Sequence, residues 1–216
     1  TEDLSRQFLD YGRYFVPERE GQIQRIVALL GDLKQRATIL ELCCGEGLLA
    51  EVILATYPNY SILAYDGSTE MLTRAQIRLA RYKDRLFCQR FDLVSTSWRT
   101  LESQVDAVIS SLAIHHLPGP QKQVLFKDIF RNLIPGGMLV ISDVLEVVGP
   151  TGKTLAAEEW DRAVHQRSME LDGNDKAFDF FSTEGWNMHR YLDPEDIDKP
   201  SPLFSQLKWL EEAGFI

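Results

Sequence analysis

The sequence has few cysteines, and it lacks any long apolar run. Its 216 residues include three cysteines, Cys43, Cys44 and Cys88, which form neither a CxxC pair nor a disulfide framework. This sparse, odd number predicts a reducing compartment, so we expect a cytoplasmic protein. No window approaches about 20 uninterrupted apolar residues, which argues against a membrane span. No signal peptide is visible at the start of the sequence.

Basic residues are also fewer than acidic ones. The chain has 32 acidic and 23 basic residues, and its formal net charge is −9. This balance argues against a nucleic-acid partner, because such a partner needs a clustered positive field. The one local exception comprises Arg74, Arg78, Arg81, Lys83, Arg85 and Arg90. We interpret it as a solvated face near a helix end, with an anion-binding patch as the alternative.

Short apolar runs alternate with stretches of helical period from residue 17 to residue 145. This alternation predicts an α/β, Rossmann-like fold, in which a mostly parallel sheet lies between layers of helices. Strands are expected at 38–42, 61–65, 86–90, 105–110 and 138–144, the last after a break at 135–137. Helices are expected after Pro17, over 48–56, after Ser68, after Pro120, over 155–169 and after Pro202. Residues 171–200 show no strong period, and their aromatic content favours an insertion folded over the sheet.

The most informative stretch runs from Ile39 to Gly47. A strand ends there, two glycines allow a tight turn, and a helix begins, so backbone N–H groups can approach a polar ligand closely. Ligands of open α/β sheets bind at the carboxyl ends of the strands. Asp66 ends the next strand and is placed to accept hydrogen bonds from two ribose hydroxyls. Asp92, after the third strand, is placed to meet an adenine amino group.

Two interpretations of this stretch compete. Gly45, Gly47 and Ala50, together with Asp66, also fit a dinucleotide-binding fingerprint, which would make a dehydrogenase. Glu41 argues against it, because a carboxylate beside the glycine turn would repel a pyrophosphate. The same carboxylate would attract a ligand that carries an amino group and a sulfonium.

With these residues the chain resembles the class I S-adenosylmethionine-dependent methyltransferases, over about residues 11–146 and again in the last helix. Glu41 to Gly47 resembles the family's first motif, and Asp66 and Asp92 resemble its second and third acidic motifs. The segments 106–111, 115–117, 133–137 and 210–215 resemble later motifs in the same order. Cys43 departs from the pattern, since the family usually has glycine there. Cysteine is small, so we expect the turn to survive.

The resemblance implies S-adenosylmethionine as cofactor and S-adenosylhomocysteine as product. It implies that Glu41 faces the methionine amino group, that Asp66 holds the ribose, and that Ser111 touches the methionine part. The implied cofactor contacts are Glu41, Leu42, Cys43, Gly45, Gly47, Asp66, Gly67, Met71, Asp92, Leu93 and Ser111.

The resemblance also implies one methyltransferase domain over residues 1–216. Its expected parts are N-terminal cap helices (1–37), a cofactor-binding core (38–146), a substrate lid (147–200) and a final helix (201–216). The family's sixth and seventh strands are absent before Ile216. We therefore expect that the sequence is cut short at Ile216, since a sheet that ended early would expose an apolar edge.

No residue pattern identifies a catalytic base. His116, His165 and His189 are the weak candidates. We favour a packing interpretation for His115 and His116 in the loop after the fourth strand, and a small aromatic core around His189. No spacing of histidine, cysteine and carboxylates suggests a metal site.

The sequence therefore predicts a methyltransferase that acts on a small-molecule acceptor. A tRNA- or RNA-modifying enzyme is one alternative, supported only by the arginine-rich run. A non-catalytic module that binds S-adenosylmethionine or its product is another, and a dehydrogenase is a distant one. The oligomeric state is not indicated.

Overall fold

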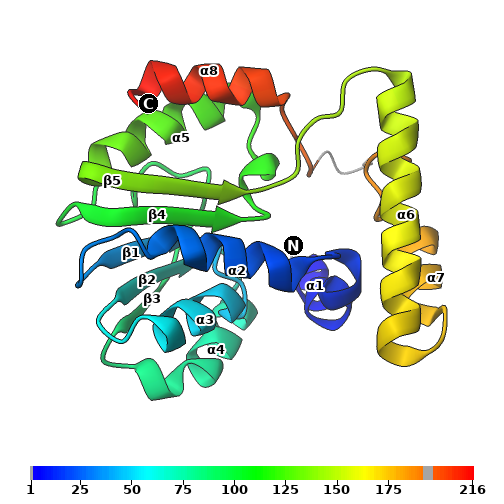
Figure 1. Ribbon diagram of the computed structural model, residues 1–216, viewed down its shortest axis with the longest axis horizontal. Coiled ribbons are helices and arrows are strands. Elements are labelled where there is room, and N and C mark those ends of the chain that lie inside the picture. The colour runs from blue at the N-terminus through cyan, green and yellow to red at the C-terminus, as the bar shows by residue number, and fades with distance from the viewer. Residues whose placement is uncertain (1, 192–196) are drawn as a thin grey trace.

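The computed structural model describes residues 2–191 and 197–216. Its centre is an all-parallel sheet in the order β3-β2-β1-β4-β5 (Figure 1). The strands are β1 (Thr38–Leu42), β2 (Ser61–Asp66), β3 (Leu86–Arg90), β4 (Val105–Ser111) and β5 (Leu133–Ser142). The chain reverses its direction of strand addition between β1 and β4. In such sheets this switch point is where ligands bind, at the carboxyl ends of the strands.

Helices cover both faces of the sheet, as expected. They are α2 (Arg19–Leu30), α3 (Leu48–Thr56), α4 (Thr69–Arg78), α5 (Gly119–Asn132) and α8 (Leu203–Ala213), with short 3₁₀ turns η1 (Ala80–Tyr82) and η2 (Ile114–His116). Alternate residues of β1 face opposite layers. Ile39 joins the apolar cluster under α2 and α3, whereas Leu40 joins the one under α5. Glu41 falls on the α2 side of this alternation.

The predicted start of α4 is confirmed in detail. Ser68 caps the helix, and its Oγ accepts a hydrogen bond from the Met71 amide at 3.2 Å. Glu70 lies in the first turn, where the helix dipole favours a negative charge. Met71, Leu72 and Ala75 are buried, as their helical spacing predicts. The capped turn fixes the chain directly after Asp66.

The fifth strand begins five residues earlier than predicted. The pairing with β4 jumps from Val105–Leu133 to Ala107–Met138, so residues 134–137 form an irregularity inside the strand rather than a break before it. Pro135 is tolerated there because β5 is the last strand of the described sheet, and an edge strand loses little when one N–H donor is missing.

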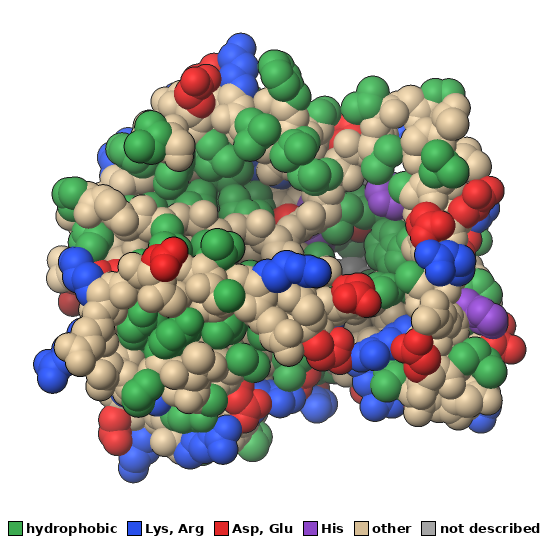
Figure 2. All heavy atoms as spheres, viewed as in Figure 1, with side chains coloured by type: hydrophobic (Ala, Val, Ile, Leu, Met, Phe, Trp, Pro, Cys, Tyr) green, Lys and Arg blue, Asp and Glu red, His purple; other side chains and the backbone are tan. Residues whose placement is uncertain are grey.

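The segment after β5 forms a separate layer beside the sheet (Figure 1). It contains α6 (Pro150–Asp172) and α7 (Lys176–Thr183), and it packs on α1 (Glu2–Phe15). The sequence analysis predicted no specific bounds for α1 or α7. Figure 2 shows that the molecular surface is hollowed between α6 and the body that contains the sheet. No helix within residues 2–191 or 197–216 combines the length and apolar character needed to cross a membrane.

Candidate active site

The turns after β1 and β2 meet at the rim of the sheet and are joined by one carboxylate. Asp66 Oδ2 accepts a hydrogen bond from the Gly45 amide at 2.8 Å, and its Oδ1 accepts one from the Ser68 amide at 2.9 Å. The side chain is buried. Asp66 therefore fixes the glycine turn against the start of α4.

The glycine turn has the left-handed backbone that its sequence predicts. Gly45 and Gly47 have φ of 56° and 82°, and Cys43 has φ of 59°. The turn thus survives at Cys43, as expected, although a residue with a Cβ is strained there. Burial, followed by the nearby carboxylates of Asp66, Asp143 and Glu41, raises the pKa of the Cys43 thiol well above its usual value. Cys43 is therefore a neutral thiol at physiological pH.

Glu41 is a buried acceptor with spare capacity. It is 3% exposed, and its Oε2 has no hydrogen-bond partner among the described residues. Burial raises the pKa of this carboxyl to about 8, although the Arg19 guanidinium opposes the rise. A buried polar atom without a partner is costly in a folded protein and commonly marks a place that a ligand fills.

Arg19, at the start of α2, is the site residue that the sequence analysis missed. Its Nη1 donates to Ser111 Oγ at 2.5 Å, and it interacts electrostatically with Glu41. Burial lowers the pKa of its guanidinium, while Glu41 raises it. No sequence signal could identify Arg19, because it precedes the periodic part of its helix and reaches the rim only through the fold.

The predicted adenine-side residues are placed unequally. Met71 is buried, and its Sδ lies 4.0 Å from the point where a Cβ on Gly45 would stand. Leu93 is half-buried and packs against the apolar cluster under α5. Asp92 is exposed, and its Oδ1 accepts from the Val94 amide of its own loop at 3.0 Å. The fold thus brings Met71 beside the glycine turn, whereas the Asp92 carboxylate is engaged by its own turn.

The histidines after β4 form a cluster that the sequence did not predict. His115 Nδ1 lies 2.5 Å from Asp143 Oδ1, and its Nε2 lies 3.3 Å from Asp198 Oδ1. His116 Nδ1 lies 3.1 Å from the same Asp198 oxygen. Burial opposes a charge on His115, but the hydrogen bonds to Asp143 and Asp198 outweigh it and raise its pKa to about 9.

The three candidate bases do not come together. His116 is exposed near the carboxyl end of β4. His165 lies on α6, where its Nε2 is 2.8 Å from Asp175 Oδ1. His189 packs against Trp160, with ring centroids 5.7 Å apart, within the aromatic layer of the insertion. Of the three, only His116 stands in the loop that follows a strand of the sheet.

The arginine-rich run is largely paired with acidic side chains and carbonyls. Arg74 pairs with Glu70, Arg78 with Glu46 and Glu51, and Arg81 with Glu51. Arg85 donates to three backbone carbonyls. Most of the charge in this run is therefore already neutralised or bonded within the fold, which leaves little of it for an anion-binding patch.

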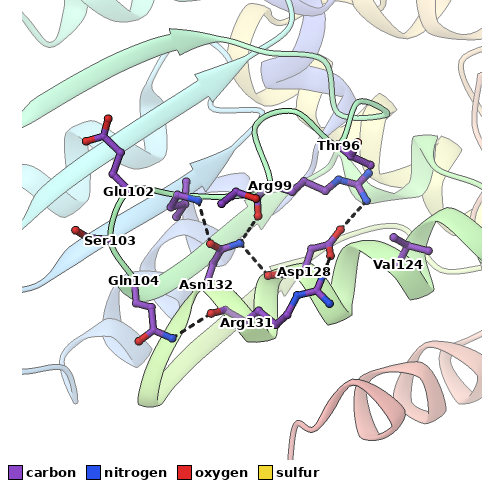
Figure 3. A pocket seen from close by; sticks show the side chains of 11 residues that line it. Thr96, Arg99, Glu102, Ser103, Gln104, Val124, Asp128, Arg131 and Asn132 are labelled. Carbon is purple, nitrogen blue, oxygen red and sulfur yellow. Dashed lines mark hydrogen bonds and ion pairs between the residues drawn. The ribbon is translucent and has the colours of Figure 1, made fainter.

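A separate hollow of about 730 Å³ lies away from the rim (Figure 3). It is lined by residues 96–104 and by the later turns of α5, where Arg99 and Asp128 form a buried ion pair at 3.1 Å. Asn132 ties the two walls together, since it accepts from the Leu101 amide and donates to the Arg99 carbonyl. Residues 99–104 directly precede β4, so this hollow lies at the amino end of that strand. This hollow is not the predicted cofactor site.

Residues 39–137 match a protein family described as "Methyltransferase domain". A trans-aconitate 2-methyltransferase from Variovorax paradoxus is 27% identical over 130 residues, which cover 60% of this chain and 46% of that protein. A carboxy-S-adenosyl-L-methionine synthase from Trichodesmium erythraeum is 26% identical over 110 residues, covering 50% of this chain and 42% of that protein. The chain spans about half the length of these curated relatives.

Solved structures agree on the fold. Phosphoethanolamine N-methyltransferase 2 of Haemonchus contortus, in complex with S-adenosyl-L-methionine, has a TM-score of 0.65 and 20% identity over 98% of this chain and 42% of its own. The cyclopropane synthase MmaA2 of Mycobacterium tuberculosis has a TM-score of 0.60 and 16% identity over 90% and 61% of the two chains. Residues 39–137 thus match a methyltransferase domain in sequence, in agreement with the motif order, and the solved structures share the fold of the chain.

Proposed function

We propose that this protein transfers a methyl group from S-adenosylmethionine to a small-molecule acceptor. The observation that carries the proposal is the pair of buried carboxylates, Glu41 and Asp66, on either side of the glycine turn. They stand at the carboxyl ends of neighbouring strands, at the switch point of the sheet.

The residues present fit this cofactor. Glu41 Oε2 is a buried acceptor without a partner, which suits the ammonium of the methionine part. Asp66 would hold the ribose, and Met71 with Gly67 would flank the adenine. Leu42, Cys43, Gly45 and Gly47 would pass under the methionine and ribose, with Leu93 and Asp92 along the adenine edge. Arg19 and Ser111 would complete the methionine end.

When bound, S-adenosylmethionine supplies a methyl group on a positively charged sulfur. The chain's own contribution is to orient the acceptor and exclude water, which alone can supply roughly 7 kcal/mol or more. A base is needed only if the attacking atom carries a proton that must leave. We propose that the insertion predicted at 147–200, of which residues 192–196 lie outside the described part of the chain, covers the acceptor. His116, the candidate at the rim, would take such a proton when there is one.

The acceptor is proposed to be a small molecule because one relative is named for methylation of trans-aconitate. The RNA alternative loses its one supporting observation, since the arginine-rich run is paired within the fold. A non-catalytic binding module would bind S-adenosylmethionine without turnover. We also propose a cytoplasmic location, on the ground that the three cysteines are free thiols.

The first test is titration calorimetry of the full chain with S-adenosylmethionine and S-adenosylhomocysteine. We expect both to bind at one site, and Asp66→Ala to weaken binding by about 1–3 kcal/mol, because ribose hydroxyls then lose their acceptor. Since Asp66 also anchors two turns, thermal unfolding must show that the variant is folded at the assay temperature. Arg99→Lys, in the hollow at the opposite end of β4, should leave binding unchanged and serves as the control. Absence of binding by the native chain would refute the proposal.

Turnover is measured separately, as S-adenosylhomocysteine released in the presence of a panel of acceptors that includes small carboxylic acids. If S-adenosylmethionine binds but none of the acceptors leads to released S-adenosylhomocysteine, the result favours the non-catalytic binding module.

A further inference from the structure

Three separate segments bring a group of metal-ligating side chains to one place. His115 and His116 lie on η2, Asp143 follows β5, and Asp198 lies before α8. One ligand atom from each of His115, His116 and Asp198 lies within 4.8 Å of the other two. The cofactor contacts and the insertion core do not use this group, and a metal ion bound to His116 would replace the role of that side chain as a proton acceptor.

The spacing of these atoms suits a tetrahedral metal ion. Two ligands that each lie about 2.0–2.1 Å from zinc at a tetrahedral angle stand roughly 3.3 Å apart. Here Asp198 Oδ1 lies 3.3 Å from His115 Nε2 and 3.1 Å from His116 Nδ1. Two edges of the tetrahedron are thus already present. The two imidazole nitrogens lie within 4.8 Å of each other, so they would have to move closer together to form the third edge.

An outer carboxylate orients one of the imidazoles. Asp143 Oδ1 accepts from His115 Nδ1 at 2.5 Å, and Asp143 Oδ2 accepts from the His115 amide at 3.0 Å. Metal-binding histidines in proteins characteristically donate their second ring N–H to such a carboxylate. This contact fixes the tautomer that leaves Nε2 free to coordinate, and it points that nitrogen at Asp198.

The chain directly after Asp198 is held in place by the core. The Lys199 amide donates to the His115 carbonyl at 2.7 Å. The buried Lys122 ammonium donates to the Lys199 carbonyl at 2.6 Å and to Ser201 Oγ at 2.8 Å. Asp198 is therefore positioned by backbone and core contacts on its own segment, and not only by the histidines that it meets.

We propose that His115 Nε2, His116 Nδ1 and Asp198 Oδ1 bind one divalent transition metal ion of the zinc type. Two imidazoles and one carboxylate are a ligand set that such ions prefer, and hard cations such as Mg²⁺ favour oxygen instead. Three protein ligands leave a fourth position, as in catalytic zinc sites. His116 is exposed, so a cation and an oxygen ligand can reach it from solvent. The competing arrangement is a protonated His115 held between two carboxylates, without metal.

The test is a titration of the metal-free full chain with Zn²⁺, and separately with Mg²⁺. We expect one equivalent of Zn²⁺ to bind and Mg²⁺ to bind far more weakly. His116→Ala and Asp198→Ala should each weaken Zn²⁺ binding at least tenfold. His165→Ala is the matched control: His165 also meets a carboxylate, Asp175, at 2.8 Å, but it belongs to no group of three metal-ligating side chains within residues 2–191 and 197–216.

Co²⁺ gives an independent readout, since a tetrahedral Co²⁺ site absorbs visible light strongly and an octahedral aquo ion does not. We expect this absorption in the native chain and in His165→Ala, and its loss in His116→Ala. Failure of the native chain to bind Zn²⁺ stoichiometrically would overturn the site, as would equal affinity in all variants. Both titrations measure metal alone, so their outcome is independent of whether methyl transfer is found.

Discussion

Glu41 is a residue whose ionisation is linked to folding. Its pKa is about 8 in the folded protein, where burial dominates, against about 4.5 for an unperturbed glutamate. Between these two values the folded state holds a proton that the unfolded state has released. The contribution of Glu41 is therefore fully present below pH 4.5 and is lost as pH rises through about 8.

Glu41→Gln tests this linkage, because an amide of similar shape cannot ionise. We expect the stability of the native chain, relative to the variant, to fall by roughly 3–5 kcal/mol between pH 4.5 and pH 8. Urea unfolding at a series of pH values gives the difference curve. A difference that does not change with pH would show that Glu41 is ionised in the folded protein.

Single residues also mark where prediction from the sequence succeeds. Glu41, Gly45, Gly47 and Asp66 were predicted because local sequence fixes them, through a strand end, a tight turn and a second strand end. Arg19 could not be predicted, because a tertiary contact brings it to Ser111.

The sequence analysis did not predict the group of His115, His116 and Asp198 for a similar reason. His116 and Asp198 are far apart in the sequence, and only the packing of the segment before α8 against η2 unites them. The cofactor roles of the motif residues stay predictions until binding is measured.

At the scale of elements, the packing of α3 on α4 depends on one glycine. Gly47 has φ of 82°, and a Cβ there would stand 2.8 Å from Leu79 Cδ1 and 3.3 Å from Ala75 Cβ. Gly136 has a similar φ of 78°, but a Cβ there would meet nothing within 4 Å. A comparison of alanine substitutions at these two positions therefore distinguishes the cost of the left-handed backbone from the cost of steric overlap.

We expect Gly136→Ala to destabilise the protein by about 1–2 kcal/mol, the cost of the left-handed backbone. Gly47→Ala should cost a further 1–3 kcal/mol or so, because the helices must move apart. Denaturant midpoints of the two variants, measured side by side, test the difference. Equal losses would mean that α3 and α4 absorb the methyl group without strain.

Elements with a clear period were predicted closely, and elements built by packing were not. The strands at 38–42 and 86–90 and the helix at 48–56 have the predicted bounds. The fifth strand was placed too late, because Pro135 with two glycines signals a break in isolation but is accommodated at a sheet edge. The helix α7 has aromatic residues on more than one side, since they contact both α1 and α6, and this obscures its period.

At the scale of the whole molecule, the described residues form two bodies with separate apolar centres. The second centre joins α1 to the insertion through Tyr14, Phe15, Val164, Ala177 and Phe181. Phe181 is fully buried, with its ring 5.1 Å from Phe15 and 5.6 Å from Trp160. The predicted aromatic core around His189 is only partly present: His189 packs on Trp160 and Trp186 packs against this centre, which also includes α1, whereas Tyr191 is exposed.

Phe181→Ala should therefore destabilise this second body by about 3–5 kcal/mol. Hydrogen exchange should show lost protection in α1, α6 and α7, while β1 and β4 keep theirs. Phe204→Ala is the control, since that ring is 81% exposed and its loss should change stability by less than about 0.5 kcal/mol. Uniform loss of protection over the whole chain would show instead that both bodies unfold as one unit.

The bond from the Trp160 indole to the Phe15 carbonyl, 2.9 Å long, has a mechanical consequence. It fastens the first helix to the insertion, although the sheet separates them in the sequence. A movement of α6 away from the body that contains the sheet would therefore carry α1 with it.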